Sequence, residues 1–273
     1  MVIRYDSPTN LLVATKGHPF DKEALFGMFD AMRGLTWTHV EQPAAVTMFN
    51  TEAAKDFAAY ILYDVPGIQF KTPKPPLLIA PPKAMADGFE ALLEAGQPFI
   101  FLHHAVAGWP IWDRYAEAIG ARFFYQRGTY KGRSFPDSGY NFPVTYRAEP
   151  ASDHPILNGL EGGFDLTDEL YLMELLEDDI VPLLHAKHEF VQGNFHSAAN
   201  ALEARMWTSD GWEHGPGTDL IAWARRVGNS PIVYIQAGND GATFGNEDYR
   251  KLLRNAIDWV TGPEAAEWAR EKR

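Results

Sequence analysis

The sequence of 273 residues contains no cysteine. Disulfide bonds, a cysteine nucleophile and thiolate metal ligands are therefore excluded. The sequence also has no run of about 18 consecutive apolar residues, the length that a membrane-spanning helix needs. Its first residues lack the basic start and long apolar segment of a signal peptide. We therefore expect a cytoplasmic protein that has no membrane partner.

Positive charge is also scarce, because 24 Lys and Arg stand against 36 Asp and Glu, for a formal net charge of −12 at pH 7. Nucleic acids are bound mainly by Lys and Arg that neutralise phosphates, so we expect no nucleic-acid partner. The sequence has no GxGxxG motif, no phosphate-binding GKS/T motif and no HExxH motif, so no nucleotide cofactor is indicated. The sequence does not decide whether the protein forms a homo-oligomer.

Apolar segments with the length of buried strands alternate with segments of helical periodicity. We expect strands at 11–15, 60–63, 99–102 and 232–235. Continuously apolar strands that alternate with helices predict an α/β fold, with a parallel sheet covered by helices on both faces. Residues 121–217 are rich in glycine and aromatic residues, which predicts one domain over 1–273 with an irregular insertion there. The proline-rich segment 66–82 is expected to be irregular and to wall the site.

Polar residues follow several of the expected strands. In open parallel sheets, ligands bind beyond the carboxyl ends of the strands. The residues found there are Lys16, Gly17 and His18 after the first strand, Asp64 and Gly67 after 60–63, His103 and His104 after 99–102, and Gln236, Gly238, Asn239 and Asp240 after the last. We therefore expect His18, Asp64 and at least one of the two adjacent histidines to share one pocket.

The adjacent histidines are expected to have different roles, because side chains alternate along a strand. His104 lies nearer the turn, so we place it in the cleft. The positive end of a helix starting near Trp109 would then keep it neutral. We place His103 in the wall, buried, neutral and bonded to backbone without an acidic partner. The alternative is that both histidines are structural. The turn after them has no Ser or Cys, so it lacks an elbow nucleophile.

Two other groups of residues are weaker candidates. Asp168 and Glu169 could do acid–base work, although adjacent carboxylates are also typical of a solvated turn. Trp212 in a glycine-rich loop could line a sugar site, since carbohydrates stack on aromatic faces. The segment that contains His185 and His188 is read as a strand and loop rather than as a metal-binding helix.

Blocks from TKGHPFDKEALFGMFD near the start to YRKLLRNAIDWV near the end together resemble the trehalose-utilisation ThuA-like family, from about residue 11 to 262. That family is similar to the class I glutamine amidotransferases, which implies a flavodoxin-like, three-layer α/β fold, and it implies sugar metabolism. The family's motifs fall on Gly17 and His18; on Tyr63, Asp64, Pro66 and Gly67; on His103 and His104, followed by Gly108 and Trp109; and on Asp168, Glu169 and Tyr171.

One position departs from the family pattern. Many relatives carry Gly-His-Asp after the last strand, whereas this chain has Gly238, Asn239 and Asp240. A histidine base is therefore missing there, and without cysteine the protein is not a Cys-dependent amidotransferase.

These observations predict an enzyme that acts on a sugar or keto-glycoside by histidine-based hydrolysis or elimination. The expected catalytic residues are His104, His103 and Asp64, and a divalent metal at His18 and His104 is left open. The expected substrate-binding residues are His18, Gly67, Trp109, Glu169, Tyr171, Trp212, Gln236, Asn239 and Asp240. The alternative is a non-catalytic sugar-binding or regulatory protein that retains the crevice, and the asparagine at position 239 favours it.

Overall fold

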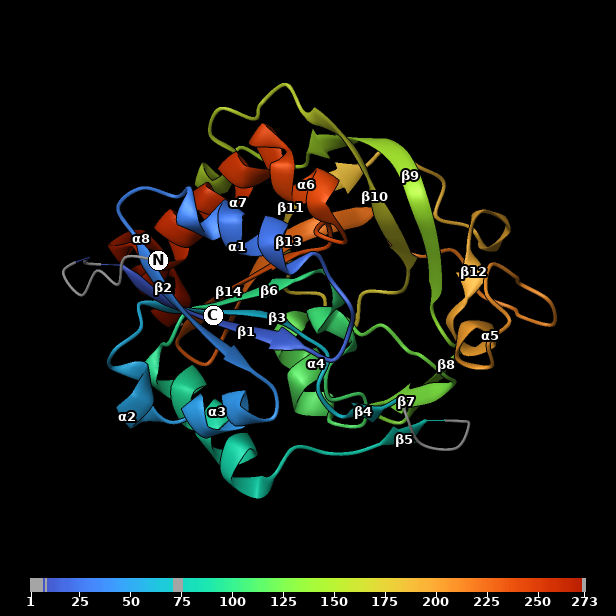
Figure 1. Ribbon diagram of the computed structural model, residues 1–273, viewed down its shortest axis with the longest axis horizontal. Helices are drawn as coiled ribbons and strands as arrows, with labels where there is room; N and C mark the ends of the chain where they lie inside the picture. Colours follow the sequence, from blue (N-terminus) through green and yellow to red (C-terminus); the bar gives the residue numbers. More distant parts are fainter. Residues whose placement is uncertain (1–6, 8, 71–75, 272–273) are drawn as a thin grey trace.

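The computed structural model describes residues 7, 9–70 and 76–271. Within them, ten strands form one sheet in the order β10-β9-β11-β13-β14-β6-β3-β1-β2, with β12 paired to β9 (Figure 1). The strands are β1 (Asn10–Lys16), β2 (Thr36–Glu41), β3 (Ala59–Asp64), β6 (Phe99–Leu102), β9 (Gly139–Pro150), β10 (Phe164–Leu172), β11 (Val181–Ala186), β12 (His196–Ser197), β13 (Leu220–Val227) and β14 (Ser230–Ile235).

The central part of this sheet is parallel. Every pairing in the order β14-β6-β3-β1-β2 is parallel. All residues of β3, β6 and β14 are buried, as expected for strands covered on both faces. The four predicted strands are therefore confirmed, and so is the α/β fold with a mainly parallel central sheet.

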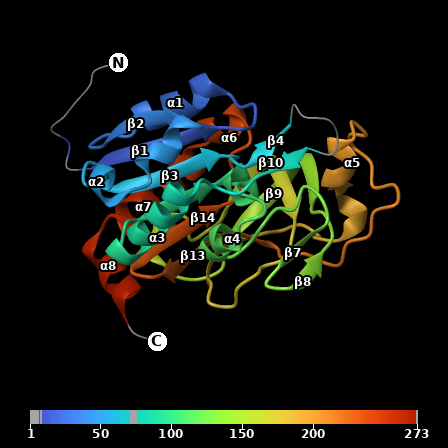
Figure 2. The same cartoon turned by 90° about the horizontal axis from the view of Figure 1, so that it is seen from below.

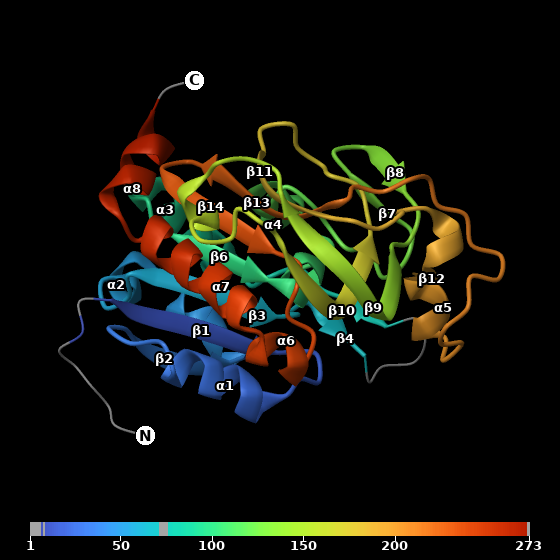
Figure 3. The ribbon, with the colours of Figure 1, turned by 90° about the horizontal axis from the view of Figure 1, so that it is seen from above.

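Helices cover both faces of the parallel part. One face carries α1 (Lys22–Asp30), α6 (Gly241–Gly245), α7 (Glu247–Val260) and α8 (Pro263–Arg270), and the other carries α2 (Thr51–Ala54), α3 (Lys83–Ala95) and α4 (Asp113–Ile119) (Figures 1 and 3). Side chains along β1 alternate between the two layers, because Leu11 and Val13 join one core cluster and Leu12 and Ala14 the other. Among the described residues, no helix combines the length and apolar character needed to cross a membrane.

Residues 121–217 are more regular than the sequence suggests. The antiparallel strands β9, β10 and β11 extend the central sheet, and β7 (Gly128–Tyr130) pairs with β8 (Arg133–Phe135). Burial alternates along most of β10, since only one of its faces packs on the core. Its sequence therefore mixes apolar and polar residues, and this makes the strand harder to recognise than the continuously apolar central strands. The helix α5 (Ala198–Leu202) and β12 lie at the end of the molecule away from both termini (Figure 2).

The proline-rich segment holds a short hairpin of β4 (Ile68–Gln69) and β5 (Leu77–Leu78), so it is not wholly irregular. Residues 71–75 of this segment lie outside the described residues. Phe70 follows β4 and packs edge-on against Tyr125, with 5.5 Å between the ring centroids.

Two glycines in helices differ in how closely the rest of the protein packs around them. A Cβ at Gly88 in α3 would lie 1.7 Å from the carbonyl oxygen of Phe49, whereas a Cβ at Gly27 in α1 would meet nothing within 4 Å. We expect Gly88→Ala to lower the free energy of unfolding by about 3 kcal/mol through overpacking. Gly27→Ala should raise it by roughly 0.5–1 kcal/mol, because alanine has less backbone entropy to lose. Urea denaturation of both variants measures this, and equal effects would contradict the packing described.

Candidate active site

The two adjacent histidines lie in a sharp turn at the end of β6. Residues His103–Ala107 form the 3-10 helix η2, and α4 begins only at Asp113. His103 has a φ of 46°, in the left-handed region that non-glycine residues rarely adopt. The expectation of a helix starting near Trp109 was therefore wrong. The dipole of such a helix does not account for a neutral His104.

His103 lies in the wall and is fully buried. Its Nδ1 is 2.5 Å from the carbonyl oxygen of Gln236, and its Nε2 is 2.8 Å from the hydroxyl of Tyr171 and 3.2 Å from a carboxylate oxygen of Glu169. Burial alone disfavours the imidazolium, but the hydrogen bond and charge of Glu169 outweigh it and raise the pKa of His103. The expected burial is confirmed, whereas the expected lack of an acidic partner was wrong.

His104 faces the pocket, although it is only 3% exposed. The ring centroids of His18 and His103 each lie 4.2 Å from that of His104. Burial first, and then the charges of His103 and His18, hold the pKa of His104 well below its ordinary value. Its Nε2 has no hydrogen-bond partner among the described residues. A buried, unpaired ring nitrogen costs about 1–3 kcal/mol, so it calls for a functional explanation.

Glu169 reaches the histidines because of an irregularity in β10. The register between β9 and β10 shifts between Asp168 and Leu170, and such bulges re-aim a side chain. Asp168 is fully buried and accepts hydrogen bonds from the backbone N–H groups of Gly238, at 2.6 Å, and Asn239, at 3.1 Å. Burial raises the pKa of Asp168, although the charge of His103 and then the N–H group of Gly238 oppose the shift. The interpretation of Asp168 and Glu169 as a solvated turn was therefore wrong.

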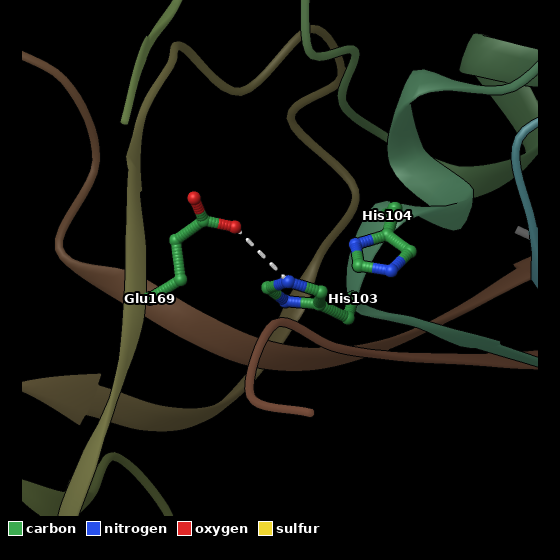
Figure 4. Close-up of side chains that lie close together, drawn as sticks. All are labelled: His103, His104 and Glu169. Carbon is green, nitrogen blue, oxygen red and sulfur yellow. Dashed lines mark ion pairs between the residues drawn. The ribbon is translucent and has the colours of Figure 1, made fainter. Parts of the chain in front are cut away.

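His104 and Glu169 line a cavity of about 120 Å³. Its polar side chains are His18, His104 and Glu169, together with the hydroxyls of its tyrosines. The remaining wall is apolar and aromatic, formed by Ala107, Phe123, Tyr125, Tyr140, Tyr171, Ala198, Ala201 and Met206. Figure 4 shows Glu169 pointing from β10 toward the two histidines. The structure therefore brings together four residues predicted from sequence, namely His18, His104, Glu169 and Tyr171, with His103 directly behind them.

Asp64 does not line this cavity, contrary to the expectation from the sequence. The ring of Tyr63 lies 4.8 Å from that of His104, so the next residue of β3 points to the opposite side of the sheet. There Asp64 is buried and accepts a hydrogen bond from Gln42 Nε2 at 2.7 Å. Burial raises its pKa to about 6.

Three other predicted binding residues pack inside the protein and do not line the cavity. Gly67 has a φ of 84°, and a Cβ there would lie 2.9 Å from the ring of Trp109, so these two residues pack on each other. Trp212 is buried and donates its indole N–H to the carbonyl oxygen of Asp137 at 3.0 Å.

The residues at the end of β14 act as supports. Gln236 holds His103 through its backbone carbonyl, and Asn239 donates its backbone N–H to Asp168. Asp240 caps α6 by accepting from the N–H groups of Ala242 and Thr243.

Apart from Tyr171, the aromatic wall of the cavity was not predicted from the sequence. Phe123 and Tyr125 belong to the segment RFFYQ, and Tyr140 is the second residue of β9. Met206 lies in the loop after α5 and is half exposed. The concentration of aromatic residues in residues 121–140 was the available signal, but nothing in the sequence places it against the histidines.

His103, His104 and Glu169 could hold a metal ion. Each offers one ligand atom, and these three atoms lie within 4.8 Å of one another. The sequence left open a metal at His18 and His104 instead. His18 is adjacent, but its Nδ1 lies 2.9 Å from the carbonyl oxygen of Pro19.

The fold is that of the glutamine amidotransferase-like α/β proteins. A glutamine amidotransferase from Thermotoga maritima is similar in structure, with a TM-score of 0.50 and 9% identity, over 93% of this chain and 98% of that chain. The model of the ThuA family, described as trehalose utilisation, matches residues 31–260. The chain therefore belongs to the ThuA family.

Two ThuA-like proteins of known structure are also similar to this chain. The protein from Parabacteroides merdae has a TM-score of 0.65 and 14% identity, over 97% of this chain and 93% of its own. The protein from Bacteroides uniformis has a TM-score of 0.60 and 17% identity, over 95% of this chain and 94% of its own. At these identities the likeness shows the fold alone. No curated protein matches the sequence.

The buried carboxyl of Asp64 predicts a pH-dependent stability. Its pKa of about 6 exceeds the unfolded value of about 3.9, so the folded state binds the extra proton between these values. Its contribution to stability therefore falls as pH rises from about 4 to 6. Asp64→Asn removes this dependence. We expect the variant to gain about 2–3 kcal/mol over the natural protein on going from pH 4 to pH 7, measured by urea denaturation. A difference between the two proteins that is constant over this range would refute the assignment.

Proposed function

We propose that the protein is an enzyme of carbohydrate metabolism that acts on a sugar or keto-glycoside, by hydrolysis or elimination, in the cavity beside His104. The family description, trehalose utilisation, supports the substrate class. One observation carries the proposal: two imidazoles lie side by side in an aromatic-walled cavity that also contains a carboxylate.

The wall of the cavity suits a sugar. Aromatic faces pack against the C–H groups of a sugar ring, while His18, Glu169 and the tyrosine hydroxyls can bond its hydroxyl groups. The volume of about 120 Å³ is below the roughly 300–1,000 Å³ of typical ligand pockets. One part of a disaccharide would therefore enter, while the rest would lie at the mouth near the half-exposed Met206.

The polar groups suit proton transfer beside a carbonyl. A base must take the C–H proton, and His18 and His104 both present an imidazole to the cavity. The electron pair of that C–H bond forms an enolate. When the enolate collapses, a C=C bond forms, the bond from the adjacent carbon to the glycosidic oxygen breaks, and that oxygen leaves as an alcohol after taking a proton from the imidazolium. Addition of water to the resulting double bond gives the product of hydrolysis.

The hydroxyl of Tyr171 lies 2.8 Å from Nε2 of His103, so it can donate to the enolate oxygen when that nitrogen carries a proton or binds a cation and does not accept from Tyr171. Burial first, and then the charge of Glu169, keep the pKa of Tyr171 well above its ordinary value, so its hydroxyl remains a hydrogen-bond donor. A fixed donor at the position where negative charge develops lowers the barrier more than it aids substrate binding.

The test compares two histidine variants. His104→Gln keeps a polar side chain of similar size but removes the imidazole. His185→Gln, the matched control, changes an exposed histidine of β11 that pairs with Asp219. Trehalose and its keto derivative are supplied, binding is measured by calorimetry and product by chromatography. We expect turnover to fall about 10²–10⁴-fold in the first variant and to stay unchanged in the control.

The other outcomes separate the candidate functions. Natural turnover in His104→Gln would contradict the proposal. Sugar binding without turnover in the natural protein would favour the alternative, a non-catalytic sugar-binding protein, for which Asn239 in place of a histidine is the motivating observation.

A further inference from the structure

The side chains of His103, His104 and Glu169 converge from two elements, η2 and β10 (Figure 4). Nε2 of His103 lies 3.2 Å from a carboxylate oxygen of Glu169. Two ligands that each lie 2.0–2.1 Å from a tetrahedral zinc ion are about 3.3 Å apart. The pair therefore already has the spacing of two ligands of one ion, and a ligand atom of His104 lies within 4.8 Å of both.

The backbone orients His103 as a metal ligand is oriented. Its Nδ1 faces the carbonyl oxygen of Gln236 and must donate a proton to it. In the neutral form of His103, Nε2 then carries a lone pair, which faces the hydroxyl of Tyr171 at 2.8 Å and the carboxylate of Glu169 at 3.2 Å. Metal-binding histidines almost always use their second nitrogen in this way. The hydroxyl of Tyr171 can donate to this lone pair, but the lone pair and the carboxylate oxygen 3.2 Å from it repel each other unless a proton or a cation lies between them.

The position of His104 favours a cation over a proton between His103 and Glu169. A proton shared by His103 and Glu169 would explain that pair, but it would give no role to His104, although one ring nitrogen of His104 lies within 4.8 Å of both ligand atoms. Nδ1 of His104 has only a long contact of 3.4 Å with the hydroxyl of Tyr171. A metal ion bound by all three side chains uses both histidines, and its donor set of two imidazoles and one carboxylate is complete for an open site.

We propose that His103, His104 and Glu169 bind a divalent ion of the zinc type, with the remaining coordination position open to the cavity. Imidazole ligands favour Zn²⁺ or Co²⁺ over Mg²⁺ and Ca²⁺, which prefer oxygen. The open position would take water or a sugar oxygen. With His104 engaged as a ligand, His18 is the imidazole left to act as base. This binding site does not depend on the proposed reaction.

The experiment is a titration of the chelator-treated full chain with Co²⁺, followed by the visible bands of four-coordinate cobalt and then by displacement with Zn²⁺. We expect one Co²⁺ per chain and a rise in melting temperature with excess metal. Glu169→Gln, which keeps the shape of the side chain, should bind Co²⁺ at least about tenfold more weakly. The matched control is Glu174→Gln, which alters a carboxylate just beyond β10 that pairs with Arg133, and it should bind as the natural protein does.

Three results would overturn the site: no stoichiometric Co²⁺ binding, equal affinities of the two glutamate variants, or nitrogen NMR spectra in which both ring nitrogens of His103 stay protonated in excess Zn²⁺. The melting temperature of Glu169→Gln without metal shows whether that variant is folded. Metal binding without sugar turnover would contradict only the proposed reaction. Full turnover by protein that cannot bind Co²⁺ would contradict only the metal site.

Discussion

The hydrogen bond between Nδ1 of His103 and the carbonyl of Gln236 links the ends of two parallel strands, β6 and β14. It fixes the imidazole so that Nε2 meets Tyr171 and Glu169 of the antiparallel strand β10. The two parts of the sheet thus meet at one buried side chain. The pocket, the unpaired nitrogen of His104 and the grouping of possible metal ligands all depend on this arrangement.

The parallel part of the fold and two of its histidines could be predicted from sequence. Strands buried on both faces must be apolar throughout, so FIFL and its counterparts are distinctive. Because parallel strands end at one edge of the sheet, His18 and His104 were expected to meet there, and they do. The same rule could not tell which of Tyr63 and Asp64 points toward His104, since a shift of one residue along a strand exchanges the two faces.

The other wall of the site could not be predicted, because it depends on contacts between segments distant in sequence. Glu169 faces His103 through a shift in the register of β10, and no local pattern in FDLTDELYL indicates a bulge. Tyr140 and Met206 lie on segments with weak periodicity, which tertiary contacts alone bring to the histidines. Polar residues that looked functional, such as Asp240, proved to satisfy backbone N–H groups instead.

The central claim is that the cavity beside His104 is where the protein binds its sugar. Nitrogen NMR of histidine-labelled protein, titrated with trehalose and with its keto derivative, tests this most directly. The account predicts saturable shifts of the ring nitrogens of His18 and His104 with at least one of the two sugars, while the exposed His185 on β11 stays unchanged. Saturable binding of either sugar that shifts neither His18 nor His104 would contradict it.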